Sequence, residues 1–193
     1  MAQPILLFFI GAIIGAVITA VATAAQWYVA RPKLVIEVGS DGPFILAAPH
    51  KESPSGVATW LRFRVDNSSL FTARGVRAYL TDVTPDPENK TKQNLPYFKN
   101  DALLLWASSA GDGKSTDPIS ISPNFGRFFD FAFFYGKDDL RIPNEIYYKE
   151  QGYVPGKYRF RVVIAGENFY PIEKTILVHF SGAKDTPHVV LLD

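Results

Sequence analysis

The sequence contains no cysteine, which excludes disulfide bonds, thiol catalysis and cysteine metal sites and fits either a reducing or an oxidising compartment. The net charge is only +1. A nucleic-acid-binding protein normally carries a basic face, so we expect no nucleic-acid partner. The three histidines, His50, His179 and His188, have no histidine or cysteine at a ligand spacing. We therefore expect structural histidines, no metal site and no cofactor.

Charge is also absent from the first 30 residues, so every acidic and basic side chain follows them. The run from Ile5 to Ala25 consists of Ile, Leu, Val and Phe diluted by glycine, alanine and two threonines. At about 1.5 Å per residue such a helix extends about 30 Å, the hydrocarbon thickness of a bilayer. Residues 1–30 are thus predicted to form one transmembrane helix with an interfacial flank. The expected membrane-interface residues are the aromatic pair Trp27 and Tyr28 and the head-group anchors Arg31 and Lys33.

A cleaved secretory signal is the alternative interpretation of this segment. Ala20-Val21-Ala22 and Ala22-Thr23-Ala24 both fit a small-x-small cleavage site. However, no lysine or arginine precedes the apolar run, and the run is longer than a usual signal core. Both points favour a retained anchor.

Small residues recur every four positions along the predicted helix. They form two neighbouring rows, Gly11, Gly15, Thr19, Thr23 and Ala12, Ala16, Ala20, Ala24. Such rows let a second helix approach closely in a membrane, which predicts a helix-packing surface for other transmembrane subunits. Small residues are also simply common in membrane helices, which is the alternative explanation.

The basic residues nearest the helix follow it, and none precedes it. The positive-inside tendency therefore places the C-terminal domain in the cytoplasm, on a bacterial inner membrane with a single pass. Glu37 and Asp41 follow soon after, so a periplasmic domain stays the alternative.

Residues 31–193 are long enough for one domain with its own core. In "ATWLRFRVDN" the apolar residues Leu61, Phe63 and Val65 alternate with Trp60, Arg62 and Arg64, and "GKYRFRVVIAG" repeats the pattern around Tyr158, Phe160, Val162 and Ile164. Alternation of this kind is typical of strands with one buried face. About nine strands are predicted, including 33–38, 75–83, 103–107, 119–122, 127–135, 172–180 and 188–192, whereas 144–151 is expected as loop. The fold class is therefore all-β, an antiparallel β-sandwich.

Three stretches carry a resemblance to a known family. "FRVDNSSLFTARGVRAYL" resembles the strand, Asn turn and Ala-rich return strand of immunoglobulin-like and CARDB-like modules of bacterial surface and membrane proteins, and "YVPGKYRFRVVIAG" is similar to their late Pro-Gly-x-Tyr strand. "ISPNFGRFFDFAF" resembles the middle strand that precedes it. The resemblance covers roughly residues 57–180 and implies an Ig-like sandwich in a membrane-anchored protein. Such modules mostly hold other things in place.

Only "ARPK", residues 30–33, separates the predicted helix from the first strand. A linker this short reaches about 10 Å when extended. The sandwich is therefore expected to lie against the membrane surface.

"LLLWASSAGDGKST", residues 103–116, has the look of a phosphate-binding loop, but Ser108 stands where the first glycine is needed and Pro118 follows instead of a helix. We expect a solvated loop. The carboxylate pairs Asp86/Glu88 and Asp138/Asp139 are expected to be solvated charges. The sequons at Asn67 and Asn89 carry little weight in a bacterial protein.

The segment "NFGRFFDFAFFY", residues 124–135, is apolar at almost every position. Strict alternation places Phe129, Phe131, Phe133 and Tyr135 on one face. One interpretation is a central strand whose outer face is covered by a loop, and the other is an aromatic surface that meets a partner or the bilayer.

These patterns predict a non-catalytic accessory or scaffold subunit of a larger membrane complex, with a photosynthetic or respiratory complex as one class of host. Its partners would be other transmembrane subunits and the lipid bilayer. The alternative is a membrane-anchored ligand- or glycan-binding module, which would require a pocket lined by Trp60, Trp106 or Tyr97. No nucleophile-and-base or metal constellation is visible that would indicate an enzyme.

Overall fold

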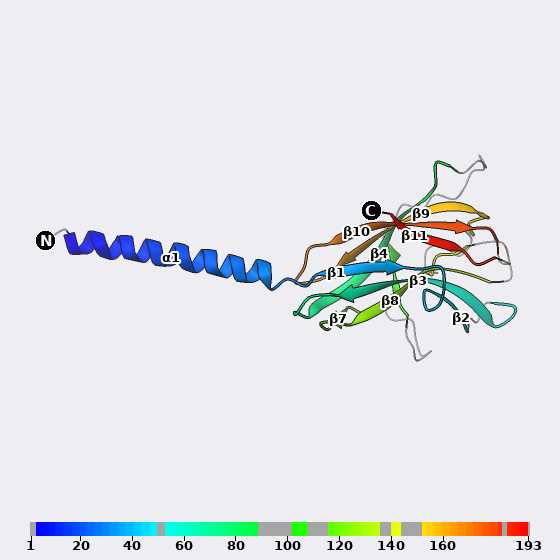
Figure 1. The fold of residues 1–193 in the computed structure, drawn as a ribbon, viewed down its shortest axis with the longest axis horizontal. Coiled ribbons are helices and arrows are strands. Elements are labelled where there is room, and N and C mark those ends of the chain that lie inside the picture. Colours follow the sequence, from blue (N-terminus) through cyan, green and yellow to red (C-terminus); the bar gives the residue numbers. More distant parts are fainter. Residues whose placement is uncertain are drawn as a thin grey trace.

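The structure is a computed structural model that describes residues 3–49, 53–88, 102–107, 116–135, 140–143, 152–182 and 185–192. Within these ranges one helix, α1 (Gln3–Val29), precedes eleven strands in two antiparallel sheets. Figure 1 shows α1 extending away from the sheets along the long axis of the molecule. The all-β architecture expected from the alternating segments, preceded by a helix, is confirmed.

The first sheet has the order β1-β3-β8-β6, with β2 added beside β3. Its strands are β1 (Leu34–Val38), β2 (Ile45–Pro49), β3 (Val57–Asn67), β6 (Leu105–Trp106) and β8 (Gly126–Phe134). The second sheet has the order β11-β10-β9-β4-β5, with β7 beside β4. Its strands are β4 (Ala73–Pro85), β5 (Ala102–Leu103), β7 (Ile119–Ile121), β9 (Gly156–Ala165), β10 (Ile172–Phe180) and β11 (His188–Leu192).

The core lies between the two sheets and matches the predicted faces of the two alternating strands. From β3 it takes Leu61, Phe63 and Val65, and from β9 the residues Tyr158, Phe160, Val162 and Ile164, all fully buried. Burial of each large apolar side chain contributes about 1.5–3 kcal/mol. The polar residues between them, such as Arg64 and Arg159, point to the outer faces, as the period of two requires.

The segment 103–107 departs from its prediction as one strand. Ala102–Leu103 pairs with β4 in one sheet, and Leu105–Trp106 pairs with β8 in the other. Leu104, between them, is buried in the common core. The chain therefore crosses from one sheet to the other here. The sequence of a short apolar run does not reveal such a crossing, because the residues on both sides of it are equally apolar. The strand β2 was not predicted either.

The helix predicted at the N-terminus is present as 27 residues from Gln3 to Val29, and "ARPK" is the whole linker before β1. The side chains of residues 3–10 and of Trp27 lie outside the described part. Within the residues that are described, the structure holds no helix that is both long enough and apolar enough to cross a bilayer. The membrane span predicted over Ile5–Ala25 is therefore not supported by the structure and stays a prediction.

Candidate functional site: the helix-proximal end of the sandwich

Four connections meet at the end of the sandwich where α1 enters. They are the α1–β1 linker (30–33) and the loops 68–72, 122–125 and 166–171, which lead into β4, β8 and β10. The registers place them together, because Leu34 pairs with Asn67, Asp66 with Gly126 and Arg77 with Ala165. We call this the proximal end. The opposite end, where β4 ends and β11 begins, is called the distal end (Figure 1).

Asn67, the last residue of β3, ties two of these loops together. Its buried side-chain amide donates hydrogen bonds to the carbonyl oxygens of Phe71 (2.7 Å) and Ile121 (2.9 Å). Its side-chain oxygen accepts from the backbone N–H and the hydroxyl of Ser69. Its backbone N–H donates to Phe125, and its carbonyl accepts from Asn124. Asn67 thus satisfies backbone groups of loops 68–72 and 122–125 at once. With its amide buried and engaged, it is no glycosylation acceptor in the folded chain.

Asn168 plays the corresponding part for loop 166–171. Its side-chain oxygen accepts from the backbone N–H of Arg74 (2.9 Å), and its amide donates to the carbonyl of Thr72 (2.9 Å). Gly166 lies so close to this strand that an added Cβ would meet the carbonyl oxygen of Arg74 at 2.7 Å. The loop therefore has little room for another position against β4.

The linker from α1 is held by the same loops. The backbone N–H and the hydroxyl of Ser68 both donate to the carbonyl of Lys33 (2.9 and 3.1 Å). The guanidinium of Arg31 lies over the Tyr170 ring, with Cζ 3.7 Å from the ring centroid, a cation–π contact. Of the four predicted interface residues, Arg31 is thus half-buried against loop 166–171, Lys33 and Tyr28 are exposed, and the Trp27 side chain lies outside the described part.

The two small-residue rows lie on an exposed surface of α1. A Cβ added at Gly11 or Gly15 would meet nothing within 4 Å. The Thr19 hydroxyl donates to the carbonyl of Gly15 (2.8 Å), so it needs no partner outside the helix. The rows are therefore smooth and unoccupied within the described chain.

The aromatic strand corrects one prediction. Phe129, Phe131, Phe133 and Tyr135 are all buried, so they form no exposed partner surface. They also do not share a face. The pairing of β8 with β3 shifts between Leu61 and Arg62, leaving Phe131 as an extra residue. This bulge sends Phe129 and Phe131 into the main core and Phe133 and Tyr135 to the outer side, because one inserted residue reverses every later side chain.

The outer side of the first sheet carries a small second cluster. Phe133 stacks on Trp60 (centroids 4.8 Å apart) and lies 5.9 Å from Tyr135, with Ala58 beside them. Trp106 instead packs in the main core against Phe129 and donates its indole N–H to the carbonyl of Asp117. The two tryptophans that were candidates for a ligand pocket are thus buried in different clusters. Tyr97, the third candidate, lies outside the described residues.

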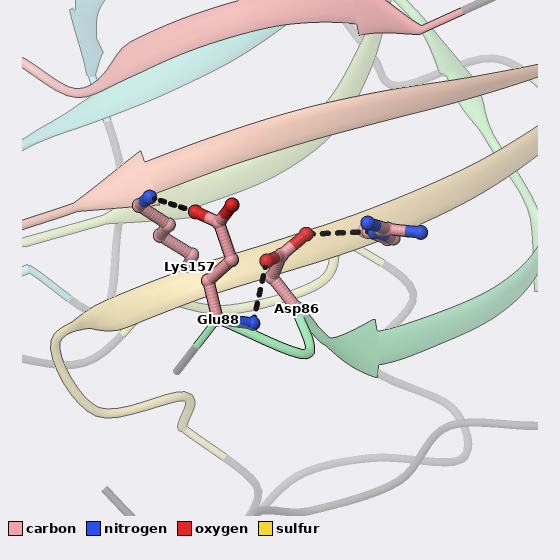
Figure 2. Close-up of polar contacts among 4 residues, drawn as sticks. Asp86, Glu88 and Lys157 are labelled. Atoms are coloured by element: carbon pink, nitrogen blue, oxygen red, sulfur yellow. Dashed lines mark hydrogen bonds and ion pairs between the residues drawn. The ribbon is translucent and has the colours of Figure 1, made fainter. Parts of the chain in front are cut away.

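A compact ion-pair cluster lies at the distal end. The buried Asp86 carboxylate accepts from the Arg159 Nε–H (2.7 Å) and from the backbone N–H of Glu88 (2.9 Å). Figure 2 shows Glu88 in turn reaching the Lys157 ammonium, at 2.8 Å. Burial raises the pKa of Asp86, but the Glu88 N–H and the Arg159 guanidinium outweigh it and leave the pKa below its ordinary value. The prediction of solvated charges holds for Glu88 but is wrong for Asp86.

This cluster closes the distal end of the β4–β9 pair, where Asp86 N–H also donates to the carbonyl of Lys157. Both Asp86 oxygens are engaged and its pKa is lowered. The carboxylate is therefore held in its ionised form as an acceptor and is poorly suited to act as a proton donor. This geometry supports a structural role, in which Asp86 holds the end of β4 against β9.

Other sequence candidates gain little from the structure. His179 and His188 lie opposite each other in the β10–β11 register, and both are exposed. Over the described ranges no group of three or more His, Cys, Asp or Glu side chains is placed to hold a metal ion. His50, the loop around Gly113, the pair Asp138/Asp139 and the sequon at Asn89 lie outside the described residues.

Comparison with known proteins adds no identity. No protein-family model, no curated protein and no solved structure matches this chain.

Proposed function

We propose that this protein is a single-pass, membrane-anchored accessory subunit, in which α1 is embedded in a lipid bilayer and the sandwich covers a surface of a larger membrane complex. One observation carries the proposal: large apolar side chains are exposed around α1, namely Ile13, Ile14, Val17, Ile18 and Val21. A helix that is apolar all round is stable only inside a protein or a membrane. A covering from outside the described chain is therefore needed.

The full sequence of α1 supports lipid as that covering. Residues 5–10 of the same helix are Ile, Leu, Leu, Phe, Phe and Ile, and no residue of α1 is charged. At about 1.5 Å per residue its 27 residues extend about 40 Å, which exceeds the hydrocarbon core of a bilayer. A helix satisfies its own backbone hydrogen bonds, as lipid requires.

The proposed orientation follows the charge asymmetry at the two ends of α1. Arg31 and Lys33 follow the helix, whereas Met1 and Ala2 before it have uncharged side chains. The positive-inside tendency favours a cytoplasmic sandwich on a bacterial inner membrane over a periplasmic one. A C-terminal tag that is protected from protease in intact spheroplasts would support this side, whereas its digestion there would support the periplasmic alternative.

The proposed partner contact is the surface formed by the two small-residue rows of α1. Gly15 and Ala16 lie at its centre, and both are exposed. Replacing them with leucine fills the groove that another helix would occupy. We expect G15L/A16L to lose its partner subunits during purification in mild detergent while the protein stays in the membrane fraction.

The matched control is I14F/V21F, which adds bulk on the opposite side of the helix at 100° per residue. This variant should co-purify with the same subunits as the natural chain. Undiminished co-purification of G15L/A16L would rule out the rows as the packing surface. The module itself is proposed to be of the immunoglobulin-like kind, which its two packed antiparallel sheets support.

A further inference from the structure

We propose that the proximal end of the sandwich inserts apolar loop side chains into the lipid interface around α1. The residues are Leu70, Phe71, Phe125 and Tyr170, which we call the interfacial loop set. This inference rests on the proposed embedding of α1 and adds a defined second lipid contact. It makes the sandwich a module with a fixed orientation on the membrane instead of one tethered only by its helix.

The interfacial loop set is exposed although its members are large and apolar. The exposed fractions are 83 % for Leu70, 66 % for Phe125, 66 % for Tyr170 and 41 % for Phe71. They come from three loops that are distant in sequence but lie at one end of the sandwich. Large apolar residues gathered at one end of a domain mark a contact surface.

These side chains are presented by loops in which several polar backbone groups already have hydrogen-bond partners. The carbonyl of Phe71 accepts from the Asn67 amide, and the carbonyl of Phe125 accepts from the Asn67 backbone N–H. In loop 166–171 the Glu167 N–H donates to the carbonyl of Arg74, and the Asn168 side chain fastens the loop to Thr72 and Arg74. Contact with lipid is costly for unpaired backbone groups, so these hydrogen bonds lower the penalty of insertion.

The charges around the set fit a phospholipid head group. Loops 68–72 and 122–125 carry no charged residue, and loop 166–171 carries one, the exposed Glu167. Immediately behind the tips lie Lys33, Arg74 and Arg127, all exposed, each next to or at the start of a strand at this end. Within the described part of the chain none of the three forms an ion pair. In this arrangement the apolar tips would contact the acyl chains, and the basic residues behind them would lie at the level of the lipid phosphates.

The position of α1 favours the bilayer as the occupant. Only four residues separate α1 from β1, so the loop tips cannot lie far from the end of α1. Tyr28, in the last turn of α1, is exposed, and Arg31 joins the linker to the Tyr170 ring. An interfacial aromatic on the helix and the interfacial loop set therefore belong to the same level of the membrane.

The experiment uses single-cysteine variants of the full-length chain, which has no cysteine of its own. L70C and F125C report on the set, V57C and V154C on exposed positions at the distal end, and I18C on α1. Each is labelled with a polarity-sensitive dye and reconstituted into vesicles of phosphatidylcholine and phosphatidylglycerol. Nitroxide-labelled lipids then quench dyes that touch the bilayer.

We expect quenching at Leu70 and Phe125 to exceed that at Val57 and Val154 several-fold, with a blue shift of emission at the first two sites only. Because the vesicles contain no other protein, quenching reports on lipid. Quenching at Ile18 without any at Leu70 and Phe125 would overturn the inference while leaving the embedded helix intact. Absence of quenching at Ile18 as well would overturn the proposed function itself.

A second pair of variants separates insertion from folding. L70D places a charge at the most exposed tip, and V57D places the same charge at the distal end. L70D should abolish the quenching at Phe125 while the unfolding transition in detergent stays like that of V57D. Retained quenching at Phe125 in L70D would contradict a shared insertion of the loops.

Discussion

The two ends of the sandwich differ in the side chains that form hydrogen bonds to the backbone of their loops. At the proximal end the amides of Asn67 and Asn168 bond to backbone groups, and apolar side chains point outward. At the distal end the Asp86 carboxylate accepts from the backbone N–H of Glu88 and is itself paired with Arg159, while the Glu88 carboxylate is paired with Lys157. Neutral ties tolerate a surface of low dielectric, whereas exposed ion pairs are suited to water. The difference fits the proposed function, in which the proximal end lies at the membrane and the distal end lies in water.

The largest expected effect is at Asn67. Replacing it with alanine removes four side-chain hydrogen bonds and leaves the carbonyls of Phe71 and Ile121 without this donor. Because Asn67 is buried, we expect a loss of about 2–4 kcal/mol in the free energy of unfolding. Equilibrium denaturation of the full-length protein in detergent measures it. Replacement of the exposed Ser122 with alanine is the control. If Asn67→Ala and Ser122→Ala both had a negligible effect, Asn67 would not hold the proximal loops as described.

Asp86 should come next. Asp86→Asn keeps the size but removes the charge that faces Arg159, whose side chain is nearly half exposed and can turn to water. We therefore expect a smaller loss, about 1–2 kcal/mol at neutral pH. Glu88→Gln serves as the control because the Glu88 side chain is largely exposed. A loss larger than that of Asn67→Ala would contradict the contrast between buried and half-exposed ties.

The pH dependence sharpens the prediction for Asp86. Its pKa is lowered in the folded state, so its contribution is complete above the ordinary value of 3.8 and is lost as the pH falls through the folded pKa. The stability gap between the natural chain and Asp86→Asn should thus narrow below about pH 4. Parallel denaturation curves at several acid pH values test this. A gap that widens toward acid would reverse the assigned sign.

Tyr158 provides a smaller effect at high pH. Its buried hydroxyl donates to the carbonyl of Val154 (2.6 Å), and burial raises its pKa to about 12. We expect Tyr158→Phe to cost about 1 kcal/mol. The folded state keeps the proton between the ordinary pKa of 10.0 and about 12, so the natural chain should lose stability across that window more steeply than the variant. Parallel slopes for the two proteins would contradict this.

The smallest effect is expected at Lys157. Its ammonium contacts the largely exposed Glu88 carboxylate at 2.8 Å. Pairs of this kind contribute little and are screened by salt. Lys157→Gln should leave the free energy of unfolding almost unchanged, and any difference should vanish at high salt. A large loss in the free energy of unfolding that does not depend on salt would contradict this, because it would make the distal ion pairs as important for stability as the hydrogen bonds of Asn67.

Sequence reasoning reached the parts of the fold that depend on period alone. The faces of β3 and β9 follow from Phe63 and Phe160 and their neighbours at every second position. It failed at the bulge opposite Leu61, which depends on how β8 and β3 pair, and at Leu104, where two sheets share one apolar run. Register and crossings are tertiary properties that one strand does not encode.

The candidate site was only partly accessible from the sequence. The "ARPK" linker predicted a sandwich close to the end of the helix, and Arg31 and Lys33 were singled out. The loop residues Leu70 and Phe125 were missed, because only strand pairing brings positions 55 apart to one end. Asn67 was visible only as a sequon and as the Asn turn of the family resemblance. The sequence did contain a signal for its role: a polar residue at the end of an alternating strand, directly before Ser-Ser. Asn side chains in such turns often form hydrogen bonds with the loop backbone.

The central claim is that α1 is permanently embedded in lipid, and alkaline carbonate extraction of cell membranes tests it most directly. The full-length chain with a C-terminal tag should stay in the membrane pellet, and its intact mass should include the residues before Ile5. Release of the tagged chain into the supernatant, or recovery of a shortened chain that begins after Ala25, would contradict the account.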